Sequence, residues 1–237
     1  MTARLSYQVV VMLSLAAVAA ASAAGAAPPV VAPAQPLAVL LSSHQIWSAP
    51  DQHSRPLGRV QARTPITGGA TVLPVIGNAT GAAGAAWLRV RLPGRPNGLT
   101  GWIVKRATLP SATNWHLVVS TGLRRVTVYR SGRAVRAFAA IVGKPSTPTP
   151  RGEFFVEESV LLSATAAGAP FALALSARSD VLQEFAGGPG QIALHGLANI
   201  GGTLGTAVSH GCIRVGDVAI RWLAANVGPG VPVTITG

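Results

Sequence analysis

Short apolar runs separated by glycine and proline follow one another along most of the chain. In the run Trp87–Leu92, the residues Leu88, Val90 and Leu92 share one face at the period of two that a half-buried strand shows. Runs of similar length lie at 71–76 and 101–104. Several short strands at this spacing predict a small β-barrel over residues 44–110, with Trp87 and Trp102 in its core.

A second β-rich segment is predicted over residues 116–237. Apolar runs at 117–120, 126–129 and 135–142 are separated by turn residues and predict a meander, and the run 231–236 predicts a last strand. The segment Lys144–Gly152 contains three prolines, which lack an amide donor and restrict φ, so it is neither a helix nor a central strand. The Ala- and Gly-rich segment Ser163–Pro170 predicts a flexible loop and is our candidate for the loop that covers a functional site.

One helix is predicted near the C-terminus. Asp217 can cap it, Val218, Trp222 and Ala225 recur at a spacing of three to four residues, and Gly228–Gly230 ends it. The pattern therefore predicts a mainly β chain with one late α-helix.

The first 27 residues are typical of an export signal. Arg4 precedes an apolar stretch, Val9–Ala20, and small residues suited to signal peptidase follow it. An uncleaved membrane anchor is the alternative, and we expect membrane contact only through this segment. Residues 28–43 are rich in Pro and Ala and predict an extended tether. The protein is therefore expected outside the cytoplasmic membrane, in the periplasm or cell wall.

The charge of the chain is strongly positive. Its 237 residues include 19 Lys and Arg against 7 Asp and Glu, a formal net charge of +12. The arginines occur singly or in pairs, without a long basic tract or an aromatic-basic motif, so we expect no nucleic-acid partner. An anionic cell-wall polymer is the partner that export favours.

The single cysteine of the chain, Cys212, excludes an intramolecular disulfide and a multi-cysteine zinc site. A thiol becomes a useful nucleophile when an imidazole accepts its proton and nearby positive charge favours the thiolate. His195 follows an apolar run on what is predicted to be another strand, and His210 and Arg214 lie within two residues of Cys212. We therefore predict His195 as the general base and His210 as a supporting residue; a buried structural cysteine is the alternative.

Three neighbouring residues have further predicted roles. Gly211 leaves room for backbone amides to form an oxyanion site. Arg214 can bind a substrate carboxylate, or it can pair with Asp217 on the surface. Zinc bound by His195, His210 and Cys212 is a further alternative, but an H-G-C spacing is a poor chelate and no carboxylate base is close in sequence. We expect no metal or other cofactor.

The residues His195-Gly196 and Ser209-His210-Gly211-Cys212-Ile213-Arg214 resemble the signature of the L,D-transpeptidases, also called the YkuD family. The segment Thr149–Gly152 resembles a T-P-x-G stretch that lies upstream in that family. The resemblance covers His116 to the end of the chain. In the first segment, Trp87–Val90 and Gly101–Ile103 resemble a bacterial SH3-like domain.

The family resemblance implies a β-rich catalytic fold and the formation of 3→3 cross-links between peptidoglycan stem peptides. It implies that the Cys212 thiol attacks the carbonyl that precedes the terminal D-Ala, and that His195 transfers the proton to the leaving D-Ala. It also implies that backbone amides around His210, Gly211 and Cys212 stabilise the oxyanion. It further implies that carbapenems acylate Cys212, and that the protein acts in peptidoglycan biosynthesis, cell-wall organisation and cell shape. We expect further substrate contacts in addition to these, from Ser209, Gly196 and Arg214.

One residue departs from the family pattern. Family members often have Thr or Ser after the His-Gly pair, whereas this chain has Leu197. No hydroxyl can therefore assist His195 there, and a backbone carbonyl is expected to orient the imidazole instead.

Two other functions remain open at this point. The same thioester released to water would make the protein an L,D-carboxypeptidase, because the acyl acceptor is selected by the shape of the site rather than by the nucleophile. A degenerate, non-catalytic wall-binding protein is the third possibility, although both Cys212 and His195 are present.

Overall fold

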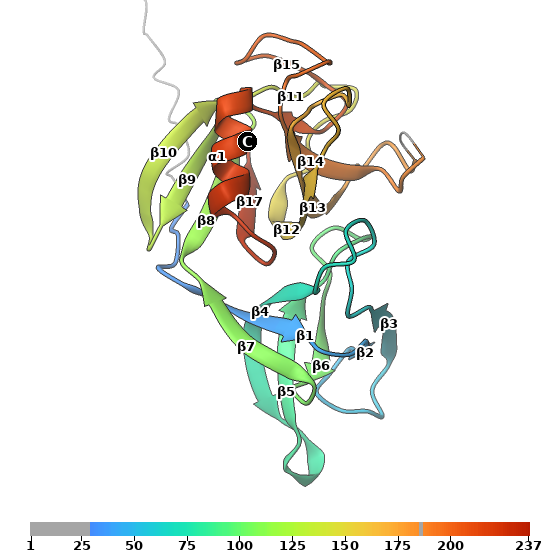
Figure 1. Ribbon diagram of the computed structural model, residues 1–237. Coiled ribbons are helices and arrows are strands. Elements are labelled where there is room, and N and C mark those ends of the chain that lie inside the picture. The colour runs from blue at the N-terminus through green and yellow to red at the C-terminus, as the bar shows by residue number, and fades with distance from the viewer. Residues whose placement is uncertain (1–28, 185–186) are drawn as a thin grey trace, which may run out of the picture.

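The computed structural model describes residues 29–184 and 187–237, and over these residues the chain forms two β-rich halves and one α-helix (Figure 1). The predicted mainly β fold with a late helix is confirmed. The predicted signal peptide lies outside the described residues. Within the described ranges, no helix has the length and apolar character needed to cross a membrane.

The first half is a seven-stranded sheet, counted over the described residues, with the order β3-β2-β6-β5-β4-β1-β7. Leu88, Val90 and Leu92 are buried as the period of two predicts, and Trp87 is buried as expected. Trp102, also predicted in the core, is only half-buried. A short 3₁₀ turn at Ala82–Gly84 precedes β5. The strands are β1 (Gln35–Leu40), β2 (His44–Trp47), β3 (Pro56–Val60), β4 (Val72–Thr80), β5 (Ala86–Arg91), β6 (Thr100–Val104) and β7 (Thr108–Thr113).

Strand β1 shows that the predicted tether over residues 28–43 was wrong in its second half. β1 pairs antiparallel with both β4 and β7 and buries Leu37, Ala38 and Leu40. The Pro-rich composition concealed this strand, but Pro36 stands near its start, where one missing amide donor is tolerated. At the other end of the half, β7 extends to Thr113, so the boundary predicted at residue 110 falls inside a strand.

The second half is an eight-stranded sheet over the described residues, with the order β10-β9-β8-β17-β12-β13-β14-β16. The predicted run 135–142 is divided between β10 and the short strand β11, which pairs with β15, and the Pro-rich residues 144–151 form neither helix nor strand. The strands are β8 (Trp115–Ser120), β9 (Arg125–Arg130), β10 (Arg133–Ala139), β11 (Val142–Gly143), β12 (Gly152–Leu161), β13 (Phe171–Arg178), β14 (Gln191–His195), β15 (Ala207–Ser209), β16 (Ile213–Arg214) and β17 (Pro232–Thr236).

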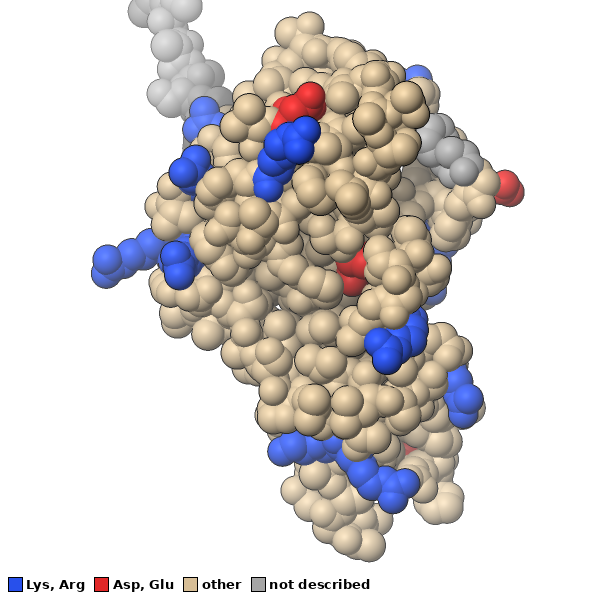
Figure 2. Space-filling view, in the orientation of Figure 1, with Lys and Arg blue, Asp and Glu red and all other residues tan. Residues whose placement is uncertain are grey.

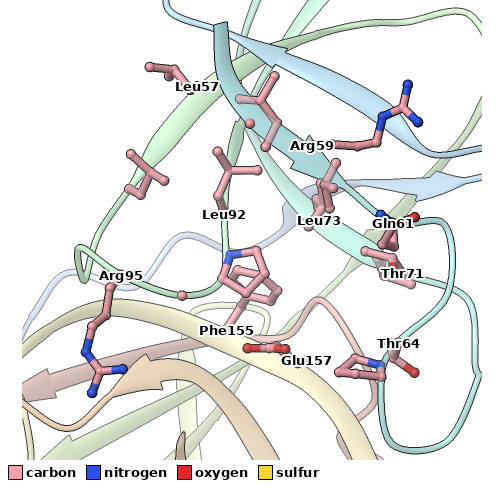
Figure 3. Close-up of a pocket in the computed structure, with 18 of the residues that line it drawn as sticks. Leu57, Arg59, Gln61, Thr64, Thr71, Leu73, Leu92, Arg95, Phe155 and Glu157 are labelled. Atoms are coloured by element: carbon pink, nitrogen blue, oxygen red, sulfur yellow. The ribbon is translucent and has the colours of Figure 1, made fainter. Parts of the chain in front are cut away.

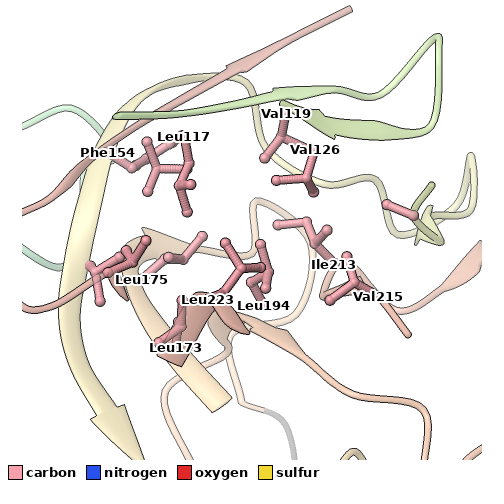
Figure 4. Packing of buried hydrophobic residues seen from close by; sticks show 14 of the residues in the cluster. Leu117, Val119, Val126, Phe154, Leu173, Leu175, Leu194, Ile213, Val215 and Leu223 are labelled. Carbon is pink, nitrogen blue, oxygen red and sulfur yellow. The ribbon is translucent and has the colours of Figure 1, made fainter. Parts of the chain in front are cut away.

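Helix α1 (Asp217–Asn226) lies where the sequence predicts it, but a different face is buried. Its N-cap is Gly216 rather than Asp217, and Val218 is 85% exposed. The buried side chains are Ala219, Ile220 and Leu223, and Figure 4 shows Leu223 among the side chains of the sheet. The predicted apolar stripe of Val218, Trp222 and Ala225 is not the buried face of the helix. Its aromatic residue, Trp222, packs only at the margin of the core, edge-on to the Trp115 ring.

Strand β12 belongs to the cores of both halves. Its side chains alternate between the two faces of the strand, so Phe154 packs in the second core and Phe155 in the first. The Glu158 carboxylate, 1% exposed, accepts hydrogen bonds from the Thr67 amide at 2.8 Å, the Thr67 hydroxyl at 2.8 Å and the Ile66 amide at 3.3 Å. A cavity of about 500 Å³ between the halves is bordered by first-half residues that include Leu57, Leu73 and Leu92, and by Phe155 and Glu157 of β12 (Figure 3).

We predict that Glu158→Ala lowers the free energy of unfolding by about 2 kcal/mol, because it removes a buried carboxylate that accepts three hydrogen bonds from Ile66 and Thr67. Denaturant unfolding followed by tryptophan fluorescence measures the change. Glu184→Ala, at an exposed carboxylate, is the matched control and should change stability by less than about 0.5 kcal/mol. Equal effects of the two substitutions would contradict the role assigned to Glu158.

Candidate active site

The predicted base is the last residue of strand β14, and the predicted nucleophile immediately precedes the parallel strand β16. β14 pairs with β16 in a register that sets Leu194 opposite Ile213 and His195 opposite Arg214. Leu194 and Ile213 are fully buried in the second core. Because side chains alternate along a strand, His195, Arg214 and, one step before the strand, Cys212 are directed to the other side.

A cavity of about 370 Å³ lies on that side, and it brings together four of the predicted site residues: His195, His210, Cys212 and Arg214. Cys212 is half-buried, whereas His210 is exposed at the rim. The remaining lining residues are Ser179, Leu182, Gly190, Gln191, Ile192 and Ile200.

Ser209 was predicted to contact substrate, but the structure buries it completely. Its hydroxyl donates to the Cys212 carbonyl at 2.6 Å and accepts from the Gly211 amide at 3.1 Å. Gly211 has φ +118°, a region that only glycine adopts readily, and a Cβ there would lie 3.0 Å from Ile192 Cδ1. Ser209 therefore shapes the turn that carries Cys212 instead of facing the cavity.

Two buried threonines also donate hydrogen bonds to carbonyls of this turn. The Thr149 hydroxyl donates to the Gly211 carbonyl at 2.8 Å and accepts from the Gly143 amide at 2.9 Å. The Thr147 hydroxyl donates to the Ser209 carbonyl at 3.3 Å. Sequence reasoning noted Thr149 only as part of a family-like stretch, and its spacing of 62 residues from Gly211 left no local signal of this contact.

The His195 ring is oriented by the backbone. Nδ1 lies 2.9 Å from the Gly196 carbonyl, which accepts its proton and leaves Nε2 as the basic nitrogen. The absence of a hydroxyl at Leu197 led us to expect such a carbonyl, and this expectation is confirmed. Gly168 (φ +84°) lies so close to the ring that a Cβ there would collide with Nδ1. The predicted loop Ser163–Pro170 thus packs against His195.

Gly196 was also predicted to contact substrate, and the structure gives it a packing role instead. It is buried, and a Cβ would meet the Ala169 carbonyl and come within 2.9 Å of Asp217 Oδ1. That carboxylate oxygen accepts the Leu197 amide at 2.8 Å. Gly196 is therefore the point where loop, strand and helix approach closely.

Arg214 does not pair with Asp217 in the described part of the chain. One terminal nitrogen donates to the Gly201 carbonyl at 3.5 Å, and the buried Nε has no hydrogen-bond partner among the described residues. An arginine with spare donors that borders a cavity can receive an anionic group.

Burial controls the protonation of the two reacting groups. It raises the pKa of the Cys212 thiol, although a hydrogen bond from the Ala193 backbone and the positive charge of Arg214 act in the opposite direction. Burial also lowers the pKa of His195, in part offset by the Gly196 hydrogen bond, and Arg214 lowers it further. Both shifts favour a neutral thiol beside a neutral imidazole over an ion pair.

Metal ligation finds no support in the arrangement of side chains. Across residues 29–184 and 187–237, no three His, Cys, Asp or Glu side chains gather in positions that could hold a metal ion.

Comparison with known families identifies the second half. Residues 114–235 match the family model described as the L,D-transpeptidase catalytic domain, YkuD. The chain is 31% identical over 129 residues to the putative L,D-transpeptidase YkuD of Bacillus subtilis, covering 53% of this chain and 68% of that protein. It is 30% identical over 132 residues to L,D-transpeptidase 1 of Mycobacterium tuberculosis, covering 51% of this chain and about half (49%) of that protein.

Solved structures of similar proteins include L,D-transpeptidase 3 from Mycobacterium tuberculosis in complex with a faropenem-derived adduct. That structure has a TM-score of 0.44 and 17% identity, with 84% of this chain and 97% of that one covered. An L,D-transpeptidase from Mycobacterium smegmatis has a TM-score of 0.40 and 20% identity, with 70% and 99% covered.

We predict that the rate of Cys212 alkylation by iodoacetamide rises with pH. The midpoint of this rise should lie above the ordinary pKa of a cysteine thiol. The thiolate is the reacting form, and burial raises its pKa, so the thiolate fraction at neutral pH is small. Rates measured by intact-protein mass spectrometry from pH 5 to pH 10 give the profile, with free cysteine as the reference. A rate that is already constant below pH 7 would contradict this prediction.

Proposed function

We propose that this chain, which belongs to the L,D-transpeptidase catalytic domain family, is an exported cysteine transpeptidase of peptidoglycan stem peptides. Its substrate would be a tetrapeptide stem ending in D-Ala, and its product a 3→3 cross-link. The observation that carries the proposal is the presence of Cys212 and His195 in one cavity, with His195 at the end of β14 and Cys212 immediately before β16.

The first half-reaction follows from the neutral thiol and imidazole. As Cys212 Sγ attacks the carbonyl carbon before the terminal D-Ala, its proton passes to His195 Nε2, which the Nδ1–Gly196 hydrogen bond leaves available. Collapse of the tetrahedral intermediate breaks the C–N bond, and the imidazolium returns the proton to the leaving D-Ala amine. A thioester on Cys212 remains.

The second half-reaction uses the same two groups. A side-chain amine of a neighbouring stem attacks the thioester carbonyl, and His195 accepts a proton from that amine. The C–S bond breaks and the Cys212 sulfur recovers a proton from the imidazolium. Water in place of the amine would give the L,D-carboxypeptidase reaction.

The oxyanion would be stabilised by backbone amides of the Cys212 turn. The Gly211 amide already donates to Ser209. The Cys212 amide has no hydrogen bond among the described residues, which makes it the better candidate donor. Of the amides inferred from the sequence, we therefore assign the principal role to that of Cys212.

Two other cavity residues would bind the substrate. Arg214 has an unpartnered buried Nε and borders the cavity, so it is suited to a carboxylate of the donor stem. His210 lines the same cavity from its exposed rim and would orient the stem peptide rather than act as the base.

The place of action is part of the proposal. The apolar N-terminal segment supports export to the periplasm or cell wall. Figure 2 shows Lys and Arg side chains at separate positions over both halves on the face in view, a distribution that suits diffuse attraction to an anionic cell-wall polymer. We further propose that the seven-stranded first half is an accessory SH3-like domain of this enzyme.

We predict that Cys212→Ala and His195→Gln each reduce product formation by about a thousandfold, since each removes one partner of the proton transfer. His53→Gln, at an exposed histidine of the first half, is the matched control and should retain full activity. The assay is mass spectrometry of the products from a tetrapeptide donor, with and without an acceptor amine.

The same assay separates the candidate functions. A cross-linked product that requires the acceptor supports transfer, whereas free tripeptide in both reactions indicates a carboxypeptidase. Unchanged cross-linking by Cys212→Ala would exclude the proposed mechanism, and no product from the wild-type protein would favour a non-catalytic wall-binding role.

A further inference from the structure

One wall of the catalytic cavity comes from the connection between β13 and β14. Ser179 and Leu182, just after β13, and Gly190 and Gln191, at the start of β14, all line the cavity with Cys212. The Ser179 amide donates to the Gly190 carbonyl at 2.7 Å, which closes the base of this connection. We call these four residues the cavity wall.

A single arginine of the first half donates hydrogen bonds to both ends of the connection between β13 and β14. Arg95 lies in the loop between β5 and β6 and borders the cavity shown in Figure 3. One terminal nitrogen donates to the Ser179 carbonyl at 2.7 Å and to the Leu182 carbonyl at 2.9 Å. The other donates to the Pro189 carbonyl at 2.8 Å. The guanidinium thus links the residues that follow β13 to Pro189, which precedes β14.

Asn97 holds the point where the cavity wall leaves β13. Its side-chain amide donates to the Arg178 carbonyl at 2.8 Å, and its side-chain oxygen accepts the Arg178 amide at 2.8 Å. This reciprocal pair imitates a neighbouring strand. Nearby, the Gly94 amide donates to the Ser176 carbonyl at 3.2 Å.

The buried ion pair at the end of β13 strengthens this anchor. Arg178 donates to the Glu157 carboxylate at 2.9 Å, and to the Leu175 and Ala177 carbonyls. The Arg178 side chain therefore fixes the strand from within the second half, while Asn97 fixes its backbone from the first half. Both halves are needed to define where the cavity wall begins.

We infer that Arg95 and Asn97 are positioning residues for the transpeptidase site, through which the first half determines the shape of the cavity wall that receives the donor stem. The inference rests on the proposed function. Arg95 is exposed, its guanidinium donates hydrogen bonds to backbone carbonyls, and it belongs to neither hydrophobic core. Its loss therefore removes the constraint on the wall without opening a core. The effect is expected for a peptide that fills the cavity and not for a small reagent that reaches only the thiol.

The test compares Arg95→Ala and Asn97→Ala with the control Arg59→Ala. Arg59 borders the same cavity between the halves and is exposed, so the control removes the same charge as Arg95→Ala. We expect Arg95→Ala and Asn97→Ala to accelerate hydrogen exchange at the amides of residues 179–182 and 190–191. They should also lower kcat/KM for the tetrapeptide donor about tenfold or more, with unchanged rates of iodoacetamide alkylation at Cys212. Thermal unfolding measured in parallel establishes that all variants are folded.

Three outcomes overturn the inference, and a fourth separates it from the proposed function. Hydrogen exchange in Arg95→Ala equal to that in Arg59→Ala would overturn it, as would faster exchange with donor kinetics equal to those of the control. If alkylation of Cys212 slowed in the variants by the same factor as donor turnover, the substitutions would act on the thiol itself, and the inference would also be overturned. A wild-type protein that neither transfers nor hydrolyses the donor would contradict the proposed function, and hydrogen exchange would then decide by itself whether Arg95 holds the cavity wall.

Discussion

The parallel pairing of β14 with β16 is the constraint on which the site depends. It sets His195 opposite Arg214, buries Leu194 and Ile213 on one side, and directs the reacting groups to the other. A shift of one residue in this register would turn the thiol into the core. The same apolar contacts that stabilise the second half thus determine which side chains reach the cavity.

Side-chain hydroxyl groups hold the turn that carries Cys212. The turn that presents Cys212 needs a glycine at φ +118°. Ser209 and Thr149 supply hydrogen bonds to the Cys212 and Gly211 carbonyls, and the hydroxyl of Ser209 also accepts the Gly211 amide. These contacts hold the turn in place before any substrate binds, which is the kind of preorganisation that acyl transfer requires.

Much of this arrangement could be predicted from the sequence, because its signals are local. The alternation at Leu88 and Val90 marked a strand, and the spacing of His210, Cys212 and Arg214 marked the site. The errors came from partners that are distant in sequence. Ser209 was interpreted as a substrate contact because its burial depends on segments far away in the sequence. The Pro-rich composition around Pro36 concealed a strand whose partners lie about 35 and 75 residues later.

The central claim is that Cys212 carries the acyl group of the donor. Intact-protein mass spectrometry of the wild-type protein mixed with a tetrapeptide stem, quenched rapidly in acid, measures this directly. The account predicts an adduct with the mass of the tripeptidyl acyl group (the donor less D-Ala), located on the peptide that contains Cys212 and released by an acceptor amine. Cross-linked product formed at full rate without any such adduct, or an adduct on another residue, would contradict it.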